Sequence, residues 1–347
     1  MIELLKQLIA TPSFSREEKQ AADLLESYLI NRQLHPQRKG NNIWLYSPAW
    51  DYRKPAILLN SHIDTVKPVD SWSQDPFLPW VKDGKLYGLG SNDAGASLVS
   101  LLQVFLRLTA KEQPNNFIFL ASCEEEVSGT GGIEAVLPEL PAIDLGIVGE
   151  PTGMQPAIAE RGLMVLDGTV RGKSGHAARN EGENAIYKAL PIIEWFQNLH
   201  FPLESDLLGP VKTTVTLIQA GTQHNVIPDT CRFTVDVRSN ELYSNEQLFE
   251  WIAGHCGCEI QARAFRLNSS RISPEHPVVQ RAEALGLKLY GSPTTSDQAL
   301  MSFPSLKIGP GSSIRSHAAD EFIGLSEIEE AIEIYFSLLD LLDLLAS

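Results

Sequence analysis

The segment AILLNSHID, residues 56–64, runs from a short apolar stretch directly into a histidine and an aspartate. Three other apolar stretches end in the same way. FIFLAS (117–122) precedes three successive glutamates, LGIVG (145–149) precedes Glu150, and LKIG (306–309) precedes a loop that contains His317. Strands of an open, mostly parallel sheet place their carboxyl ends along one edge, where ligands collect. The sequence therefore predicts an α/β sheet with a metal site at that edge.

The length and charge of the chain narrow the classes of protein to which it can belong. A chain of 347 residues exceeds the usual size of a single hydrophobic core, so we expect two domains. The formal net charge of −15 repels phosphate backbones and anionic membrane surfaces. Neither nucleic acid nor a membrane is therefore an expected partner, and no apolar run reaches the roughly 18 residues that span a bilayer.

The cysteines and the first residues indicate where the protein works. Four cysteines in a chain of this length make no disulfide framework, which favours a reducing, cytoplasmic setting. The opening MIELLKQLIATPSF contains Glu3 and Lys6 and predicts a helix, not a secretion signal. Cys256 and Cys258 could form a metal clip, but two reduced thiols are the simpler interpretation, because no second pair stands at zinc-finger spacing.

Changes in hydrophobic periodicity divide the chain. Residues 1–162 and 269–347 alternate helical patterns with short buried strands, which predicts a discontinuous domain with a mixed, mostly parallel sheet and helices on both faces. Residues 163–268 contain longer strands that alternate with period two, and predict an inserted α+β, ferredoxin-like domain. Ser15 to Glu18 resembles a capping box in front of a helix over 21–30, and a closing helix is expected over 326–345.

Several acidic residues stand where a cation would stabilise them. The three glutamates at 124–126 repel one another unless a cation or a proton relieves them, and they follow an apolar strand directly. His62 and Asp64 could be an ordinary surface pair, and Asp93 could serve only its glycine-rich turn. Together with Glu150 and His317, however, they offer imidazole and hard oxygen ligands, a set that suits zinc, manganese or cobalt.

These segments resemble the M20 metallopeptidases over essentially the whole chain. The motifs that carry the resemblance are SHIDTV (61–66), GLGSNDAG (88–95), EEEVSG (124–129), VGEPT (148–152), GKSGHAA (172–178), TSD (295–297) and SHAADE (316–321). Each motif alone is weak, but their occurrence in this order is specific. The resemblance implies a co-catalytic centre with two divalent ions, for which zinc is the first expectation.

The resemblance also implies a role for each residue of the centre. Asp93 would bridge the two ions, with His62 and Glu150 completing one site and Glu126 and His317 the other. Glu125 would be the general base of amide hydrolysis, and Asp64 would orient the histidine beside it. A shift of one residue would move the base to Glu124 and the ligand to Glu125.

The insert is expected to supply the remaining functional residues. By resemblance it is a lid and dimerisation domain, and His176 would stabilise the oxyanion in the active site of the partner subunit. Arg238 would clamp a substrate carboxylate, although an ion pair with Asp236 is the alternative. Asn225 is a second candidate for substrate binding, and Arg179 is a candidate partner for a succinyl carboxylate.

The pattern as a whole is most similar to the acetylornithine deacetylase branch. It implies hydrolysis of a small N-acyl amino acid, N-acetyl- or N-succinyl-L-ornithine or the citrulline equivalent, in arginine biosynthesis by a homodimer. A succinyl-diaminopimelate desuccinylase, a dipeptidase or aminoacylase, and a non-catalytic metal-binding protein are the alternatives. The chain departs from the family pattern at Gly95, where a lysine is usual, and at Leu89 and Asn92, where a basic residue is missing from the turn.

Overall fold

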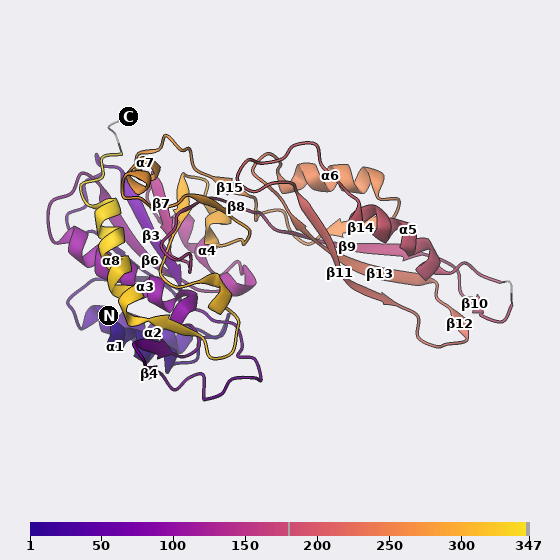
Figure 1. Ribbon diagram of the computed structural model, residues 1–347, viewed down its shortest axis with the longest axis horizontal. Helices are drawn as coiled ribbons and strands as arrows, with labels where there is room; N and C mark the ends of the chain where they lie inside the picture. Colours follow the sequence, from indigo (N-terminus) through magenta and orange to yellow (C-terminus); the bar gives the residue numbers. More distant parts are fainter. Residues whose placement is uncertain (180, 345–347) are drawn as a thin grey trace. The chain divides into compact units, whose positions relative to one another are not determined.

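The computed structural model describes residues 1–179 and 181–344, and it divides into two compact units. The first unit contains Met1–Ile158, Ile272–Tyr290 and residues from Ser296 onward, and the second contains Ala159–Arg271 and Gly291–Thr295. The insert predicted over 163–268 lies inside the second unit. The chain colours in Figure 1 show that the first unit is built from both ends of the chain and the second from its middle.

A mixed sheet forms the centre of the first unit. Its strands are β1 (Gln37–Lys39), β2 (Asn42–Tyr46), β3 (Ala56–His62), β6 (Asn116–Ser122), β7 (Leu145–Val148), β8 (Ala157–Glu160) and β17 (Ser305–Lys307). They lie in the order β1-β2-β6-β3-β7-β17-β8. The four strands β6, β3, β7 and β17 run parallel, while β1, β2 and β8 pair antiparallel. The mostly parallel sheet predicted from the apolar stretches is thereby confirmed.

The central strands are buried on both faces, as parallel strands between helices must be. All seven residues of β3 and all seven of β6 are buried. On one face, Phe105 of α3 (Ala96–Thr109) packs against Phe119, and α8 (Leu325–Leu339) lies against α3. On the other face, α4 (Ile133–Val136) shares an apolar cluster with Leu58 and Ile118. Helices therefore cover both faces, as predicted. The closing helix expected over 326–345 is shorter than predicted, because it ends at Leu339, where Asp340 adopts an extended backbone conformation. Residue 345 of that prediction lies outside the described residues.

Smaller elements complete the first unit. The remaining helices are α1 (Ile2–Ile9), α2 (Lys19–Ile30) and α7 (Pro277–Ala284). β4 (Trp80–Lys82), β5 (Lys85–Tyr87) and β18 (Phe322–Gly324) form a three-stranded antiparallel sheet. The predicted capping box at the start of α2 is wrong, because the N-cap residue Glu18 makes no side-chain cap and both candidate side chains bond elsewhere.

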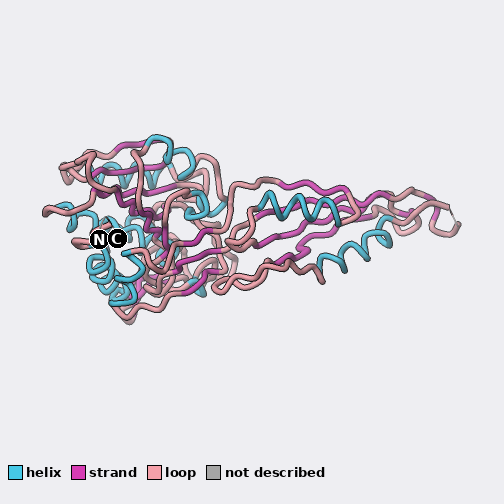
Figure 2. Tube along the Cα trace, turned by 90° about the horizontal axis from the view of Figure 1, so that it is seen from above, coloured by secondary structure: helices cyan, strands magenta, loops and turns pink. Residues whose placement is uncertain are grey.

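The second unit has β-α-β-β-α-β connectivity. Its elements are β9 (Met164–Arg171), α5 (Ala185–Gln197), β11 (Lys212–Ala220), β13 (Thr230–Arg238), α6 (Asn245–His255) and β14 (Glu259–Ala262). The strands pair antiparallel in the order β11-β13-β9-β14, which is the arrangement of a ferredoxin-like fold. In Figure 2 these strands, in magenta, lie side by side with two helices beside them.

Alternating burial explains why this insert forms an antiparallel sheet. Along β13 the side chains of Cys231, Phe233, Val235 and Val237 are buried, and they share one apolar cluster with residues of both α5 and α6. Two short strands, β10 (Gly175–His176) and β12 (Val226–Ile227), form a separate antiparallel pair in this unit. β15 (Ser270–Arg271) pairs with the end of β8, and β16 (Tyr290–Ser292) follows α7. None of the helices in the described ranges is both long and apolar enough to cross a membrane.

Candidate metal centre

Three side chains converge at the carboxyl edge of the first unit's sheet and form what we call the inner cluster: His62, Asp93 and Glu150. His62 ends β3, Glu150 follows β7, and Asp93 lies in the turn η1 (Ser91–Gly95). The Nε2 atom of His62 is 3.3 Å from Oδ1 of Asp93 and 3.7 Å from Oε1 of Glu150. One possible ligand atom from each residue lies within 4.8 Å of the other two.

A second group, the outer cluster, shares Asp93 with the first and adds Glu126 and His317. Nε2 of His317 is 3.0 Å from Oε2 of Glu126 and 3.8 Å from Oδ2 of Asp93. Here too the possible ligand atoms lie within 4.8 Å of one another. The two oxygens of Asp93 therefore face two different histidines. The structure thus brings together all five residues that the sequence analysis selected as ligands.

The separations in both clusters suit tetrahedral divalent ions. Ligand atoms at about 2.1 Å from a tetrahedral zinc ion lie roughly 3.4 Å apart. The four histidine–carboxylate distances, 3.3 and 3.7 Å in the inner cluster and 3.0 and 3.8 Å in the outer, bracket that value. Imidazole with carboxylate oxygens is a common ligand set for zinc, and the set contains no thiolate. The residues present can therefore hold two divalent ions that share Asp93.

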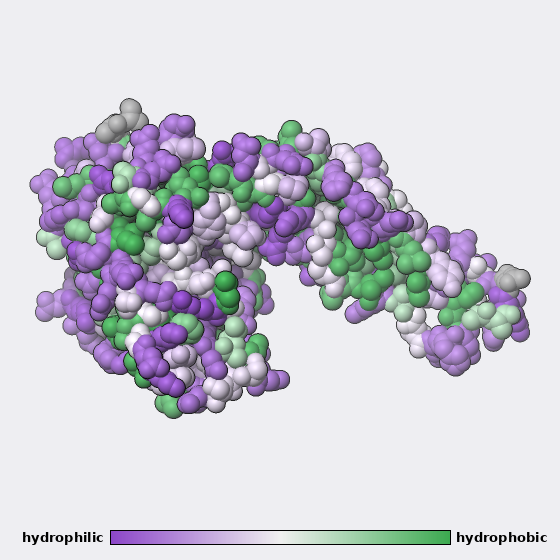
Figure 3. Space-filling model, in the orientation of Figure 1, coloured by the Kyte–Doolittle hydropathy of each residue, from purple (hydrophilic) through white to green (hydrophobic). Residues whose placement is uncertain are grey.

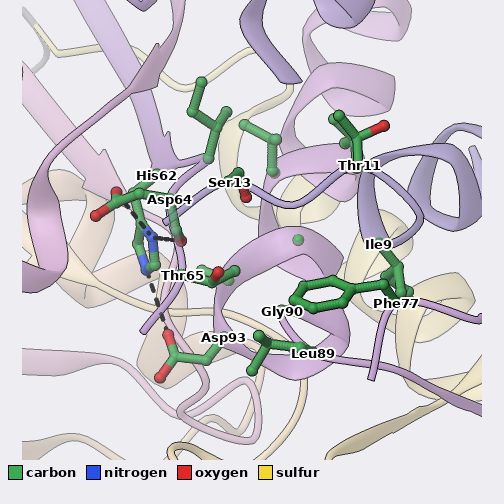
Figure 4. A pocket seen from close by; sticks show the side chains of 15 residues that line it. Ile9, Thr11, Ser13, His62, Asp64, Thr65, Phe77, Leu89, Gly90 and Asp93 are labelled. Atoms are coloured by element: carbon green, nitrogen blue, oxygen red, sulfur yellow. Dashed lines mark hydrogen bonds and ion pairs between the residues drawn. The ribbon is translucent and has the colours of Figure 1, made fainter. Parts of the chain in front are cut away.

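Asp64 fixes the orientation of His62. Nδ1 of the ring lies 2.9 Å from the backbone oxygen of Asp64 and 3.5 Å from its Oδ1, so an Nδ1–H donor leaves Nε2 free to bind a metal. Figure 4 shows His62 between Asp64 and Asp93, with the ring nitrogens directed at each. Burial opposes charge on both residues of this pair. Burial is the largest single effect, but the other interactions together exceed it. The pKa of Asp64 is lowered by the hydrogen bond and charge of His62 and by hydrogen bonds from Ser15 and Glu126, and the pKa of His62 is raised well above its usual range by hydrogen bonds to Asp64 and Asp93 and by nearby glutamates.

The three successive glutamates separate into different surroundings. Glu124 has φ of 56°, in the left-handed region, and its carboxylate lies against the glycines at 129 and 131. Glu126 joins the outer cluster. Glu125 is in neither cluster, and burial together with the charge of Glu150 raises its pKa well above the usual range. This geometry favours Glu125 as base and Glu126 as ligand over the register shifted by one residue.

The carboxylates crowd one another when no cation neutralises them. Burial raises the pKa of Glu150 to about 8, with Asp93 adding to the rise and His62 opposing it. The hydrogen bond to Glu126 raises the pKa of His317 to about 9, against the effect of burial. Protons therefore bind this edge of the sheet unusually well. Divalent cations can neutralise the same carboxylates.

Sequence reasoning assigned no role to two buried carboxylates beside the centre. Glu321 accepts hydrogen bonds from the backbone N–H groups of Gly90, Asn92 and Asp93, at 3.1, 2.8 and 2.9 Å, and burial raises its pKa to about 7. Asp297 accepts from Ser122 Oγ at 2.6 Å and from an amide on β3, and burial raises its pKa to about 6. Asp297 ends the motif TSD (295–297) and Glu321 ends SHAADE (316–321), two of the motifs that carry the resemblance to the M20 family. Their place in those motifs is the signal by which the sequence could have identified them.

The glycine at position 95, where a lysine is usual in the family, is explained by the lack of space around it. A Cβ atom there would lie 2.5 Å from the backbone oxygen of Gly90 and 2.6 Å from a methyl group of Leu5, so the turn leaves no room for a side chain. Leu89 and Phe77 line a cavity of about 20 Å³ beside His62 and Asp93 (Figure 4). Apolar side chains thus occupy the neighbourhood in which a basic residue is usual.

The other predicted site residues belong to the second unit. His176 in β10 is exposed, pairs with Val226 of β12, and accepts a hydrogen bond through Nδ1 from the N–H of Ala178 at 3.1 Å. The backbone oxygen of Asn225 accepts from the N–H of Ala177 at 3.0 Å, so β10 and β12 bring His176 and Asn225 together.

The two candidate arginines of this unit both have acidic neighbours. Arg179 is exposed, 3.9 Å from Glu181. Arg238 makes two bonds to Asp236, of 2.7 and 3.0 Å, and a third of 3.4 Å to Thr295. The ion pair that was the alternative for Arg238 is therefore present in the structure.

Comparison of the sequence with known proteins identifies related amidohydrolases. Succinyl-diaminopimelate desuccinylase 2 of Ruegeria sp. (strain TM1040) is 27% identical over 271 residues, which cover 73% of this chain and 69% of that protein. Acetylornithine deacetylase of Proteus mirabilis (strain HI4320) is 27% identical over 374 residues, which cover 98% of this chain and 96% of that protein.

Solved structures share the fold. A tripeptidase from Staphylococcus aureus superposes with a TM-score of 0.78 at 19% identity, covering 97% of this chain and 96% of that one. A dinuclear metal-binding peptidase of the M20 family from Bacillus subtilis gives a TM-score of 0.70 at 18% identity, with the same coverage of 97% and 96%. The model of peptidase family M20/M25/M40 matches residues 58–341. The chain therefore belongs to peptidase family M20/M25/M40 and is a metal-dependent amidohydrolase.

Proposed function

We propose that this enzyme hydrolyses the amide bond of a small N-acyl amino acid, with N-acetyl- or N-succinyl-L-ornithine, or the citrulline equivalent, as its substrate in arginine biosynthesis. The observation that carries the proposal is the pair of clusters sharing Asp93, with the half-buried Glu125 beside them and outside both. The acetylornithine deacetylase from Proteus mirabilis, aligned over almost all of both chains, supports the choice of substrate.

The second candidate is a succinyl-diaminopimelate desuccinylase. The relatives with that name from Ruegeria and from Parvibaculum lavamentivorans are as similar, at 27% identity, as the deacetylase. An M20 dipeptidase or aminoacylase on the same scaffold is the third. All three candidates use the same centre, so the choice between them depends on the groups that bind the acyl chain and the side chain of the substrate.

In the proposed reaction Glu125 moves the proton. Two divalent ions, zinc in our proposal and cobalt or manganese as alternatives, would polarise the scissile carbonyl and lower the pKa of the attacking water. His62, Glu150, Glu126 and His317 would hold them, with Asp93 between. Glu125 would accept the proton of the attacking water and pass it to the departing amine.

We propose that the second unit is a lid and dimerisation domain that completes the site. His176 would donate a hydrogen bond to the oxyanion in the active site of the partner subunit. Asn225, held close to it by the pairing of β10 with β12, would bind substrate. Arg238 would bind the substrate carboxylate in exchange for Asp236, and Arg179 would bind the distal carboxylate of a succinyl group.

An exposed apolar surface on the second unit supports the dimer. β11 is the edge strand of its sheet, and Leu217 and Ile218 on it are 57% and 53% exposed. Tyr187 and Leu190 on α5 are also exposed, and green side chains gather on this unit in Figure 3. A long edge strand with exposed apolar side chains is a template for pairing with a second copy.

The dimer is tested by sedimentation velocity of a Leu217→Asp, Ile218→Asp variant. We expect the variant to sediment as a monomer, because two charges would have to be buried at the interface. Tyr52→Asp, which changes a 91% exposed side chain of the first unit, is the matched control and should leave the dimer intact. A wild-type monomer, or a dimer that both variants preserve, would contradict the proposed interface.

We also propose a cytoplasmic location, in keeping with four cysteines that are all free thiols.

The proposed reaction is tested by incubating zinc- or cobalt-loaded protein with four substrates, assaying released amine with and without a chelator. N-acetyl-L-ornithine, N-acetyl-L-citrulline, N-succinyl-L-ornithine and N-succinyl-diaminopimelate separate the candidates. Chelator-sensitive turnover of an ornithine or citrulline derivative is the expected result. Turnover of the diaminopimelate compound alone would select the second candidate.

Arg179→Ala should reduce turnover of N-succinyl substrates more than turnover of N-acetyl substrates. An equal loss for both would show that Arg179 does not bind the succinyl carboxylate.

A further inference from the structure

The backbone of residues 124–126, which we call the acidic turn, is held by two buried carboxylates. Oδ1 of Asp64 accepts the N–H of Glu125 and Oδ2 accepts the N–H of Glu126, each at 3.1 Å. The preceding N–H, of Glu124, donates to Oε1 of Glu18, also at 3.1 Å. Three successive N–H groups therefore end on carboxylate oxygens. Asp64 belongs to the centre already described, but Glu18 comes from the start of α2, and its hydrogen bonds are to Arg16, Asn41 and Glu124, which are in neither cluster.

Glu18 is built into this position by further hydrogen bonds. Its side chain is fully buried. Oε1 also accepts from the N–H of Arg16 at 2.6 Å, and Oε2 accepts from the side-chain amide of Asn41 at 2.9 Å. Every partner is a donor, as an ionised carboxylate requires. The side chain is thus fixed between two turns from different parts of the chain, and it does not cap its own helix.

The residue whose N–H Glu18 binds has an unfavourable backbone conformation. Glu124 has φ of 56°, a region that residues with a side chain rarely adopt. Such conformations persist only where the surroundings hold them. The kink directs the Glu124 side chain toward the glycines at 129 and 131, and the next two residues, Glu125 and Glu126, then lie beside the metal ligands.

We propose that Glu18 is a positioning residue of the metal centre. By binding the N–H of Glu124 it holds the left-handed kink, and through the kink it sets the position of the outer-cluster ligand Glu126 and of the base Glu125. Ser15, whose Oγ donates to Oδ2 of Asp64 at 2.7 Å, anchors the second carboxylate from the same segment. The residues that resemble a capping box in the sequence therefore brace the active site.

The test is Glu18→Gln in the full chain, with two readouts. The glutamine has the same shape, but it replaces one acceptor oxygen with an NH2 group that faces donors. We expect the outer ion to be the weaker, because its ligand His317 is 55% exposed while His62 is 1% exposed. In calorimetric titrations of metal-free protein with Zn²⁺, the outer ion should lose about 10- to 100-fold in affinity, the usual effect of changing a residue that supports a metal ligand. The inner ion should stay within twofold. Glu17→Gln, the same change on the exposed neighbour, is the matched control and should alter neither.

The kinetic readout rests on the proposed function, whereas the metal titration does not. We expect kcat of Glu18→Gln to fall by a similar factor, with KM within twofold, because substrate groups are not touched. If wild-type protein cleaves none of the proposed substrates, the titration still decides the role of Glu18. An unchanged affinity for the outer ion together with an unchanged kcat would overturn the proposal. An equal loss of affinity for both ions, accompanied by a lower melting temperature, would also overturn it, because that result indicates a merely structural role.

A second variant covers the case in which Glu18→Gln does not fold. Asn41→Ala removes one of the donors that fix Glu18 and leaves its carboxylate in place. A loss of threefold or more in the affinity of the outer ion alone supports the proposal. An outer ion bound as tightly as in the wild type overturns it.

Discussion

The two clusters that share Asp93 differ in their contact with solvent. In the inner cluster the side chains of His62 and Glu150 are 1% and 14% exposed, whereas His317 of the outer cluster is 55% exposed. The inner residues extend from strands of the central sheet, and His317 lies in a loop with φ of 58°. The difference lies in the histidines, since the carboxylates of Glu126 and Glu150 are similarly shielded, at 8% and 14% exposed. We therefore expect the inner cluster to bind a divalent ion more tightly than the outer one.

The largest loss of metal and activity is expected from substitution of Asp93, which belongs to both clusters. Asp93→Ala removes an oxygen ligand from both sites, so both ions should be lost at micromolar metal. Activity should fall by more than the roughly 10³-fold that loss of a single oxyanion donor costs. Metal content after gel filtration, by mass spectrometry, and turnover measure the two effects. Retention of one ion per chain would show that the clusters are independent and would remove Asp93 from one of them.

Glu125→Gln separates chemistry from metal binding. Because Glu125 belongs to neither cluster, both ions should stay bound. Turnover should fall by about 10²- to 10⁴-fold, the usual contribution of a general base. Glu124→Gln is the control at the neighbouring position and should leave the chemical step much less affected. Full activity of Glu125→Gln would move the base to Glu124 and the register of the turn by one residue.

His317→Ala and His62→Ala compare the clusters directly. His317→Ala should retain one ion per chain and lose the outer one, whereas His62→Ala should lose the inner ion and leave the carboxylates of Asp93 and Glu150 close together. In each variant the affinity for the affected ion should fall by more than the roughly 10- to 100-fold that follows from substituting a residue that only supports a ligand through a hydrogen bond. Absorption spectra of Co²⁺-substituted protein distinguish the sites. Identical spectra and stoichiometry for the two variants would contradict the difference between inner and outer ions.

The stability of the metal-free protein should depend on pH, and this effect is expected to be gradual. Folding raises the pKa of Glu150 to about 8, of Glu321 to about 7 and of Asp297 to about 6, mainly through burial. Each raised pKa means that the folded state binds more protons than the unfolded state between the two values. The free energy of unfolding must therefore fall as pH rises from about 5 to about 8.

Each pKa unit corresponds to roughly 1.4 kcal/mol, so the total change is of the order of several kcal/mol. His317, with its pKa raised to about 9, acts in the same direction up to that pH. Chemical denaturation at a series of pH values measures the slope. Zinc-loaded protein is the control, and its slope should be smaller because cations replace the protons. A metal-free protein that is more stable at pH 8 than at pH 5 would contradict this electrostatic account.

Apolar strands in the sequence indicated where the sheet edge would lie, and the resemblance to the M20 family selected the ligands among the polar residues near it. β3 and β6 are fully buried, so the polar residues that follow them had to meet at that edge. Period-two alternation predicted the antiparallel strands of the insert, and β13 (Thr230–Arg238) shows that alternation in its burial. These elements are determined by local pattern and burial.

The supporting residues could not be predicted, because their partners are distant in the sequence. Glu321 binds the turn at 90–93, and Glu18 binds the N–H of Glu124. A local motif explained Ser15 and Glu18 as a helix cap, and only the folded chain shows that both bond to residues about 50 and 100 positions away. Long-range hydrogen bonds of this kind leave no periodic signal.

The most direct test of the two-ion centre is anomalous diffraction at the zinc edge from crystals of zinc-loaded protein. The account predicts two peaks per chain on either side of the Asp93 carboxylate, one bound by His62 and Glu150 and the other by Glu126 and His317. A single peak, or two peaks that do not share Asp93, would contradict it.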